Sequence, residues 1–299
     1  MKRIISILLV VTTTLSLALT GCSGNKNSTA STSDNNASSE PTEGGSITVG
    51  ISQDLDSLDP HLAVSAGTKE VLFNIFEGLV KPDADGNLQP AVASDYTISD
   101  DAKTYTFTLR DGVKFHNGQD VTAEDVKYSI DRCADTSNGE PLVSAFSIIE
   151  SVNIVDDKTV EINLSEPNTE FAAYMTTAII PKDYADQATA PVGTGPFKFE
   201  SRTADQDFVM VKNEDYWGTK AHLDKVVFKI IADADTLVTN LKGGSVDMVM
   251  RLTTSQAAEL TDGFHIEEGT MNLVQALYLN NAVEPFNNEK VRQALCYAI

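Results

Sequence analysis

The sequence of 299 residues predicts an α/β protein whose sheet is at least partly parallel. Two stretches support this fold class. Residues 104–133 combine a strand, two turns and a helix, and residues 226–250 form a strand, a helix and a second strand in close succession. A strand–helix–strand order places two strands side by side in one direction, because the helix carries the chain back along the sheet. The length also suffices for two domains.

The stretch 104–133 gives the most detailed local prediction. It opens with TYTFTLR, in which apolar and polar side chains alternate with the period of two typical of a half-buried strand. The pairs Asp-Gly at 111–112 and Asn-Gly at 117–118 predict turns. Thr122 then predicts the N-cap of a helix, and Asp125 at the third helical position completes a capping box.

Other elements follow from the same periodicities. An amphipathic stripe predicts a helix over 70–80 that Gly78 ends, and a shorter helix is expected near 170–177. The apolar alternations predict the following strands: 47–51, 148–155 and 159–164 as a hairpin, 197–199, 208–212, 226–231, 246–250, 264–267 and 273–280. Helices are also expected over 234–242, 253–260 and from 288 to the end.

The run LRDGVKFHNGQDVTAEDVKYSIDR, residues 109–132, resembles the signature of the family 5 extracellular solute-binding proteins, the binding components of peptide and nickel ABC importers. The segments SLDP at 57–60, GTGPF at 193–197 and NEDYWG at 213–218 are similar to this family too. The resemblance implies a periplasmic-binding-protein-like fold of type II, with two lobes joined by a hinge and an extra small α/β subdomain.

The resemblance also implies a domain organisation. Lobe I is expected to comprise 46–82 and 190–287, with an inserted subdomain at 83–189. Residues 288–299 are expected to begin a helix leading to a second large lobe that lies beyond this sequence, so we expect the chain to be a fragment or a truncated gene product.

The N-terminus has the layout of a signal peptide over residues 1–21. A basic start precedes an apolar run, which is too short and too interrupted for a comfortable membrane span. It ends in Leu-Thr-Gly before Cys22, which resembles a lipobox and predicts a lipidated Cys22; ordinary secretion with an incidental Cys22 is the alternative. Residues 22–45 are polar and predict a disordered tether.

The candidate ligand-binding residues come from the resemblance. The family has a similar SLDP stretch lining its ligand cleft, which makes Asp54, Asp56, Ser57 and Leu58 candidates here. An acidic surface loop is the alternative interpretation. The resemblance also implies that the main anchors for peptide termini lie in the lobe that is absent from this sequence.

Composition and motif content restrict the classes of function that the sequence supports. The formal charge of -21 disfavours nucleic acid as a partner, since phosphate binding requires an excess of Lys and Arg. No catalytic residue, metal site or cofactor is predicted, because the sequence lacks HExxH, GxSxG and CxxC motifs and its four histidines are scattered. Cys133 and Cys296 lie on apolar helical stripes, so we expect reduced core thiols.

Two motifs invite a ligand interpretation that the spacing disfavours. Asp83 to Asn87 reads DADGN, but an EF-hand loop counted from Asp83 would need Gly and Glu where the chain has Leu88 and Ser94, so a turn is expected. The Gly-rich 191–199 has no Lys-Ser pair and no following helix, so we expect a sharp crossover rather than a phosphate loop.

Taken with the family resemblance, these features predict a lipid-anchored receptor at the cell exterior. It would capture small peptides between two lobes and deliver them to ABC permease and ATPase subunits, acting as a monomer. The same scaffold binding a nickel chelate, haem or a sugar remains an alternative, as does a surface sensor lipoprotein; an extracellular hydrolase is disfavoured.

Overall fold

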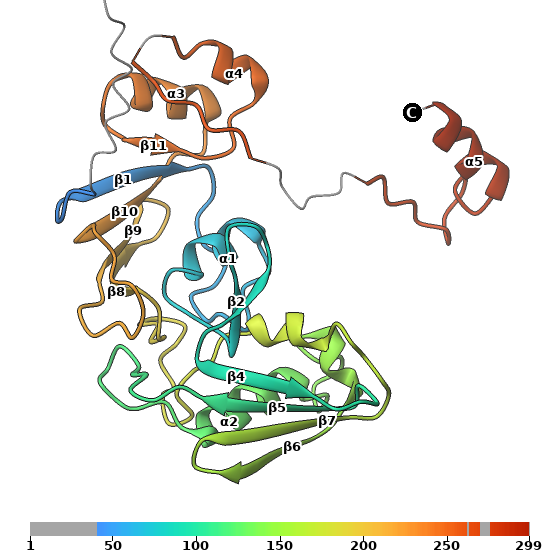
Figure 1. Ribbon diagram of the computed structural model, residues 1–299. Helices are drawn as coiled ribbons and strands as arrows, with labels where there is room; N and C mark the ends of the chain where they lie inside the picture. Colours follow the sequence, from blue (N-terminus) through green and yellow to red (C-terminus); the bar gives the residue numbers. More distant parts are fainter. Residues whose placement is uncertain (1–40, 262, 270–275, 299) are drawn as a thin grey trace, which may run out of the picture. The chain divides into compact units, whose positions relative to one another are not determined.

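The computed structural model describes residues 41–261, 263–269 and 276–298 (Figure 1). The predicted signal peptide, Cys22 and most of the predicted tether lie outside the described residues. Within them, no helix has the length and apolar character needed to cross a bilayer.

A mixed five-stranded sheet has the order β11-β1-β10-β9-β8. β1 pairs in parallel with β10 on one side and with β11 on the other, whereas β10, β9 and β8 are antiparallel neighbours. The predicted strand–helix–strand unit is confirmed as β10, α3 and β11, although β1 lies between its two strands. The bounds are β1 Ser46–Ile51, β8 Phe197–Thr203, β9 Asp207–Lys212, β10 Lys225–Ile230, α3 Ala234–Lys242 and β11 Met248–Val249.

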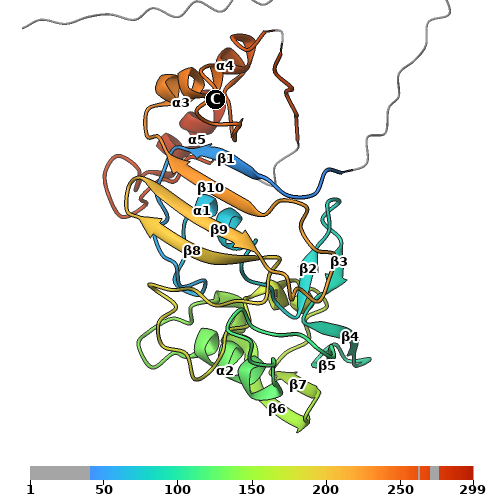
Figure 2. The ribbon, with the colours of Figure 1, turned by 90° about the vertical axis from the view of Figure 1, so that its left-hand side faces the viewer.

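The two faces of this sheet are covered by different helices. Val49, Phe228 and Phe208 occupy paired register positions, are at most 6% exposed, and share a core with Leu72 of α1 (Ala66–Leu72). On the opposite face α3 approaches so closely that a Cβ on Gly50 would lie 2.6 Å from the Leu237 side chain. Figure 2 shows α1 behind this sheet.

An antiparallel four-stranded sheet has the order β4-β5-β7-β6 and packs on α2. The strands are β4 Ala93–Ile98, β5 Thr104–Leu109, β6 Ile149–Asp156 and β7 Thr159–Leu164, and α2 is Ala123–Ala134. Tyr105 and Phe107 of β5 are fully buried, as are Val126 and Ile130 of α2 to within 1%. The predicted alternation of 104–109 and the hairpin of β6 and β7 are therefore confirmed.

The predicted capping box at the start of α2 is confirmed. The Asp125 amide donates to Thr122 Oγ1 at 3.3 Å, and the Thr122 amide donates to Asp125 Oδ2 at 2.9 Å. These bonds satisfy backbone groups that a helix start leaves without intrahelical partners.

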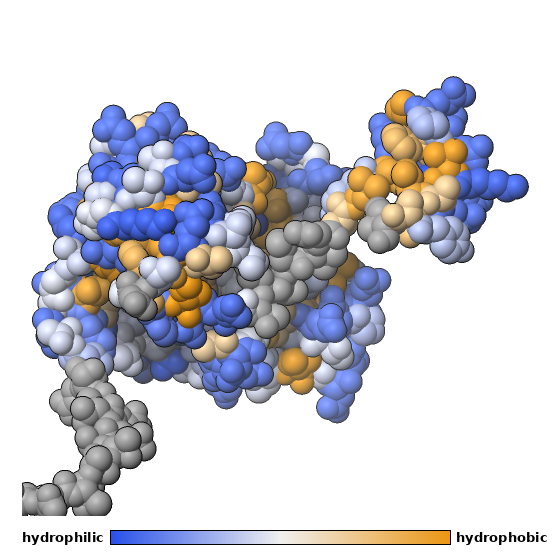
Figure 3. Space-filling model, turned by 90° about the horizontal axis from the view of Figure 1, so that it is seen from above, coloured by the Kyte–Doolittle hydropathy of each residue, from blue (hydrophilic) through white to orange (hydrophobic). Residues whose placement is uncertain are grey.

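Short elements complete the described chain. The segment DADGN is the turn expected from its spacing, since Asp83 Oδ1 accepts hydrogen bonds from the amides of Asp85 and Asn87. The remaining elements are β2 Val80–Pro82, β3 Leu88–Pro90, the 3-10 helices η1 Ser144–Ile148 and η2 Phe171–Thr176, α4 Thr254–Ala258 and α5 Glu289–Ala298. Figure 3 shows hydrophilic residues over most of the visible face, with apolar residues in separate patches.

The predicted helix over 70–80 is wrong in extent. α1 ends at Leu72, although Ile75, Phe76 and Leu79 are buried as its stripe predicted. The cause is tertiary: the carbonyls of Asn74 and Ile75 accept hydrogen bonds from the amides of 195 and 197, which lie in a loop distant in sequence. A helix here would have required those carbonyls for its own ladder.

Five further predictions need correction. The segment near 170–177 is 3-10 rather than α-helical, and 264–267 is unpaired rather than a strand. The strand over 273–280 lies partly outside the described residues, and 276–280 belong to no strand. Residues 43–45 are not tether, because the Gly44 amide donates to the His222 carbonyl at 2.7 Å. Cys133 is buried as expected, whereas Cys296 is exposed, since no residue of α5 is buried.

Replacement of Gly78 by Ala should destabilise the protein strongly. A Cβ at Gly78 would lie 2.2 Å from the Met175 carbonyl oxygen and 2.6 Å from the Thr176 backbone, so backbone must shift. We expect a loss of about 2 kcal/mol or more in the free energy of unfolding by urea titration. The control is Gly67→Ala within α1, where no close atom is met and Ala gains up to about 1 kcal/mol of helix propensity. Equal effects of the two changes would contradict this account.

Candidate functional site

Asp54, one of the four candidate ligand-binding residues, is hydrogen-bonded to strand β8 of the five-stranded sheet. Arg202 of β8 donates from Nη2 to Asp54 Oδ2 and to the Leu55 carbonyl, both at 2.8 Å. The Asp205 amide donates to the same carboxylate oxygen at 2.9 Å. The polar atoms of Asp54 are thus engaged within the protein, where they fix the start of the segment 54–58.

Asp56, Ser57 and Leu58 shape the next part of the same segment. Asp56 Oδ2 accepts hydrogen bonds from the amides of Val64 at 2.8 Å and Ser65 at 3.1 Å, closing a loop. Ser57 Oγ accepts from the Asp59 amide at 3.1 Å. Leu58 is 3% exposed and belongs to the core beneath the sheet.

The loop that Asp56 closes presents apolar side chains to solvent. Val64 is 81% exposed and Leu62 is 48% exposed, although Ala63 between them is buried. Exposed aliphatic side chains on a loop fixed by hydrogen bonds are suited to contact a ligand or a partner. Sequence reasoning missed Leu62 and Val64, because the signal was only an aliphatic pair directly after SLDP.

A second group missed by sequence reasoning joins this segment to α2. Arg132 donates to both oxygens of Asp59, at 3.0 and 2.7 Å, and to His61 Nδ1 at 2.8 Å. His61 Nε2 donates to the Ala178 carbonyl at 2.8 Å, so the ring is the neutral tautomer. Burial lowers the pKa of His61. Burial acts to raise the pKa of Asp59, but the hydrogen bonds and charge of Arg132, together with the hydrogen bond from the His61 amide, outweigh it and the pKa is lowered.

Glu77 is the centre of a third group. This carboxylate belongs to a residue only 5% exposed, and it accepts four hydrogen bonds from side chains. Oε1 accepts from Lys81 Nζ at 2.9 Å and from the Tyr216 hydroxyl at 2.6 Å; Oε2 accepts from Thr194 Oγ1 at 3.2 Å and from Trp217 Nε1 at 2.8 Å. Trp217 is partly buried against the core of the four-stranded sheet, and it therefore combines packing with a hydrogen bond.

Burial also affects the neighbours of Glu77. Burial raises the pKa of Tyr216, and the charge of Glu77 adds to this shift. Lys81 Nζ lies 4.9 Å from the centre of the Trp217 ring, and the Arg110 guanidinium carbon lies 4.3 Å from it. Both distances fall within the range of cation–π attraction.

The segment GTGPF is a close-packed crossover rather than a phosphate loop. A Cβ on Gly193 would lie 2.1 Å from the Ile75 carbonyl oxygen, so only glycine fits. The Gly195 amide donates to the same carbonyl at 2.8 Å, and the Gly193 amide donates to His116 Nδ1 at 3.3 Å. Burial lowers the pKa of His116 to about 4. Both glycine amides are therefore used within the fold.

The described residues bring together no group of three or more His, Cys, Asp or Glu side chains that could hold a metal ion. Cys133 is fully buried, and burial raises the pKa of its thiol to about 12. Such a thiol is protonated at neutral pH and unreactive. The polar groups described here fix loops in place, and the most exposed residue named in the loop closed by Asp56 is the apolar Val64.

A mixed sheet that receives an inserted antiparallel subdomain defines the class of type II periplasmic-binding-protein-like folds. Residues 87–299 match the family model described as bacterial extracellular solute-binding proteins, family 5 Middle. The chain therefore belongs to the family 5 solute-binding proteins of ABC importers, as its signature run predicted.

Curated relatives agree with this assignment. A glutathione-binding protein, GsiB of Salmonella typhi, is 33% identical over 265 residues, which are 85% of this chain and 52% of the relative. GsiB of Escherichia coli O1:K1 / APEC is 31% identical over the same shares. The chain thus spans about half the length of the curated relatives it matches.

Solved structures agree as well. DppA of Helicobacter pylori in complex with the peptide STSA is 31% identical with a TM-score of 0.68, over 74% of this chain and 49% of that one. AppA of Bacillus subtilis with a nonapeptide is 26% identical with a TM-score of 0.75, over 87% and 55%. NikZ of Campylobacter jejuni with Ni(L-His) is 26% identical with a TM-score of 0.77, over 85% and 53%.

Replacement of Arg132 by Met should cost about 3–5 kcal/mol of unfolding free energy, because it leaves the buried Asp59 carboxylate without its cation. Urea titration measures the change. The matched control is Lys114→Met, which removes an exposed pair with Asp120 and should cost at most about 1 kcal/mol. Similar losses for the two variants would contradict the structural role of Arg132.

The loop closed by Asp56 should depend on pH. Hydrogen bonds from the Thr68 side chain and from the amides of Val64 and Ser65 lower the pKa of Asp56 to about 2. A depressed carboxyl pKa stabilises the folded loop above the unfolded value near 4, and this contribution is lost as the pH falls through about 2. An NMR titration of the carboxyl carbon should give a midpoint near 2. A midpoint at 3.8 or above would contradict the hydrogen bonds.

Proposed function

We propose that this chain is part of the ligand-binding component of an ABC importer that captures small peptides and delivers them to the permease and ATPase subunits. Membership of family 5 supports the transport role. The observation that carries the site is the loop 56–65, in which Asp56 Oδ2 accepts hydrogen bonds from the amides of Val64 and Ser65 while Val64 is 81% exposed. A fixed loop with an open apolar surface costs little entropy on binding.

The segment containing Asp54, Asp56, Ser57 and Leu58 is then one wall of the ligand cleft. Its carboxylates act by positioning: Asp54 is bound to Arg202, and Asp56 holds the following loop. The direct apolar contacts come from Leu62 and Val64. The opposite wall belongs to the second lobe, and closure of the two lobes on the solute would select the bound state.

Peptides are the preferred ligand class. The structure of DppA holds the peptide STSA, that of AppA holds a nonapeptide, and GsiB is a glutathione-binding protein. Aliphatic contacts suit the side chains of an extended peptide. A nickel chelate is the second ligand class, because NikZ was solved with Ni(L-His). Haem and sugars are less favoured ligand classes than peptides and nickel chelates.

The predicted signal peptide, residues 1–21, is the basis for the location that we propose for the protein. We propose that Cys22 is acylated after removal of residues 1–21, and that a tether up to about residue 42 holds the folded part at the outer side of the cell membrane. More than one acyl chain gives stable anchoring, whereas a single chain does not. We further propose that the receptor is monomeric.

Val64→Asp should weaken peptide binding at least about tenfold without lowering stability, because Val64 is exposed and a carboxylate there meets the apolar part of the ligand. The measurement is calorimetry on the natural protein with the peptide that most raises its melting temperature. The control is Ile98→Asp in β4, which is 41% exposed on the four-stranded sheet and should leave peptide affinity unchanged.

The same screen tests the proposed function itself. We would compare how much each candidate ligand raises the melting temperature of the protein: di- and oligopeptides, glutathione, Ni(L-His) and simple sugars. The peptides would then be recovered, and their masses measured by mass spectrometry. Stabilisation by a peptide that is recovered intact supports the proposal. Stabilisation by the nickel complex or a sugar alone, or cleavage of the peptide, overturns it.

A further inference from the structure

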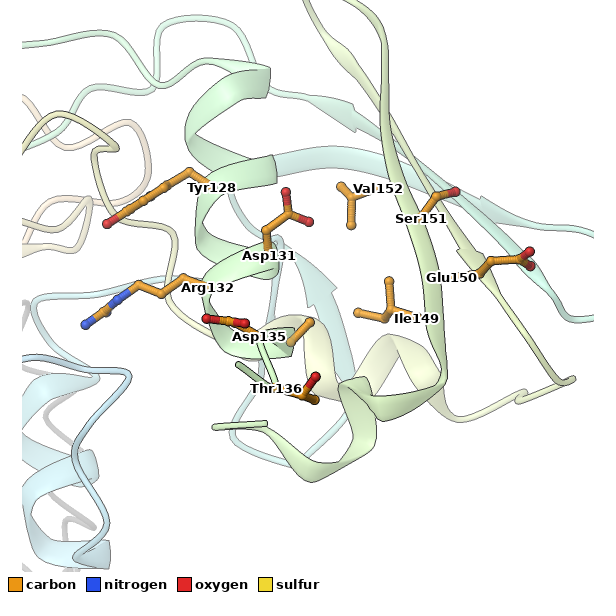
Figure 4. A pocket seen from close by; sticks show the side chains of 10 residues that line it. Tyr128, Asp131, Arg132, Asp135, Thr136, Ile149, Glu150, Ser151 and Val152 are labelled. Carbon is orange, nitrogen blue, oxygen red and sulfur yellow. The ribbon is translucent and has the colours of Figure 1, made fainter. Parts of the chain in front are cut away.

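A groove of about 650 Å³ lies between the second half of α2 and strand β6; its lining includes none of residues 54–65, although Arg132, which lines it, is bound to Asp59. Figure 4 shows Ile149 and Val152 of β6 pointing into the space between the two elements, while Asp131 lies on the side of the helix. Asp135 and Thr136 line its end. The floor is therefore apolar and the helix wall is acidic.

Strand β6 borders this groove with an unpaired edge. It is eight residues long, and within the part of the chain that the structure describes it pairs only with β7, at the end of the order β4-β5-β7-β6. Ile154 is 38% exposed and Val155 is 59% exposed. An exposed strand edge with aliphatic side chains is a template for an added strand, because its outward amides and carbonyls lack partners.

A single lysine covers part of this edge. Lys127 of α2 donates from Nζ to the Val152 carbonyl at 2.8 Å, and it also pairs with Asp131 at 2.8 Å. Among the described residues, no other side chain donates to a β6 carbonyl. Lys127 is 41% exposed in its side chain, so an incoming amide and a new cation could replace both of its contacts.

The charge around the groove indicates what would bind. The Arg132 guanidinium turns away from the groove to the Asp59 carboxylate, so it does not neutralise the helix wall (Figure 4). Asp135 and Glu150 form no salt bridge within the described part of the chain. The whole chain carries -21, so a second copy would be repelled and a cationic partner attracted.

We propose that the β6 edge and the groove beside α2 dock an extended, basic segment of a partner protein. The segment would add a strand to the four-stranded sheet, place its apolar side chains on Ile149 and Val152, and direct Lys or Arg side chains toward Asp131 and Asp135. Its amides would replace Lys127 at the Val152 carbonyl. This surface is separate from the proposed ligand site, so the two proposals fail independently.

The test uses the natural protein and a labelled peptide of about ten residues that alternates Val and Lys, the length of a long strand. Hydrogen exchange should show new protection of the amides at 150–156 when the peptide binds. Raising salt from about 50 to about 200 mM should weaken binding several-fold. A matched Val and Glu peptide, and the Val and Lys peptide with alternate N-methylated amides, should not bind.

Two sets of substitutions should change the affinity for the probe peptide in opposite directions. The double substitution Asp131→Lys and Asp135→Lys should weaken binding of the probe at least about tenfold, since it turns electrostatic attraction into repulsion. Lys127→Gln should increase the affinity for the probe about threefold, because the substitution frees both the Val152 carbonyl and the Asp131 carboxylate. Val64→Asp should leave the probe affinity unchanged.

The outcomes separate the alternatives. Protection at 150–156 with both variant effects supports the proposal. Protection confined to the loop 56–65 means that the probe entered the ligand cleft, and it overturns the proposal while leaving the proposed function intact. Binding of the N-methylated or acidic peptide overturns strand addition. Self-association of the protein through β6 without any probe overturns the choice of a basic partner.

Discussion

The buried Glu77 carboxylate is the constraint on which the arrangement of the chain depends. A buried carboxylate is costly unless every acceptor site is used, and here Lys81, Thr194, Tyr216 and Trp217 all donate to it. These partners come from three segments that are distant in sequence. The requirement to satisfy one charge therefore brings together strand β2, the GTGPF crossover and the NEDYWG segment.

The Asp59, Arg132 and His61 group extends the same principle to the loop 56–65. It binds the loop to α2 through charged and backbone hydrogen bonds, so the loop is fixed from both its sheet side and its helix side. Polar groups with complete partners give rigidity, and in the proposed function it is the apolar Leu62 and Val64 that contact the ligand. In this account, binding is achieved by a preorganised surface rather than by reactive groups.

The sequence predicted most of the regular elements because their signals are local. The alternation in 104–109 and the capping box of Thr122 each arise within a few residues. The end of α1 could not be predicted, since it depends on amides near residue 195 that are supplied by another part of the chain. The exposed Val64 was missed for a similar reason: periodicity assigns a buried face only to helices and strands, and Val64 lies in a loop whose shape Asp56 sets.

The most direct test of the central claim, a fixed and non-catalytic wall that holds a small ligand, is native mass spectrometry of the natural protein purified without denaturation. The account predicts a complex with one small ligand, lost on denaturation and identified as an intact peptide. Preparations that are empty and stay empty after incubation with peptides, or that release only cleaved products, would contradict it.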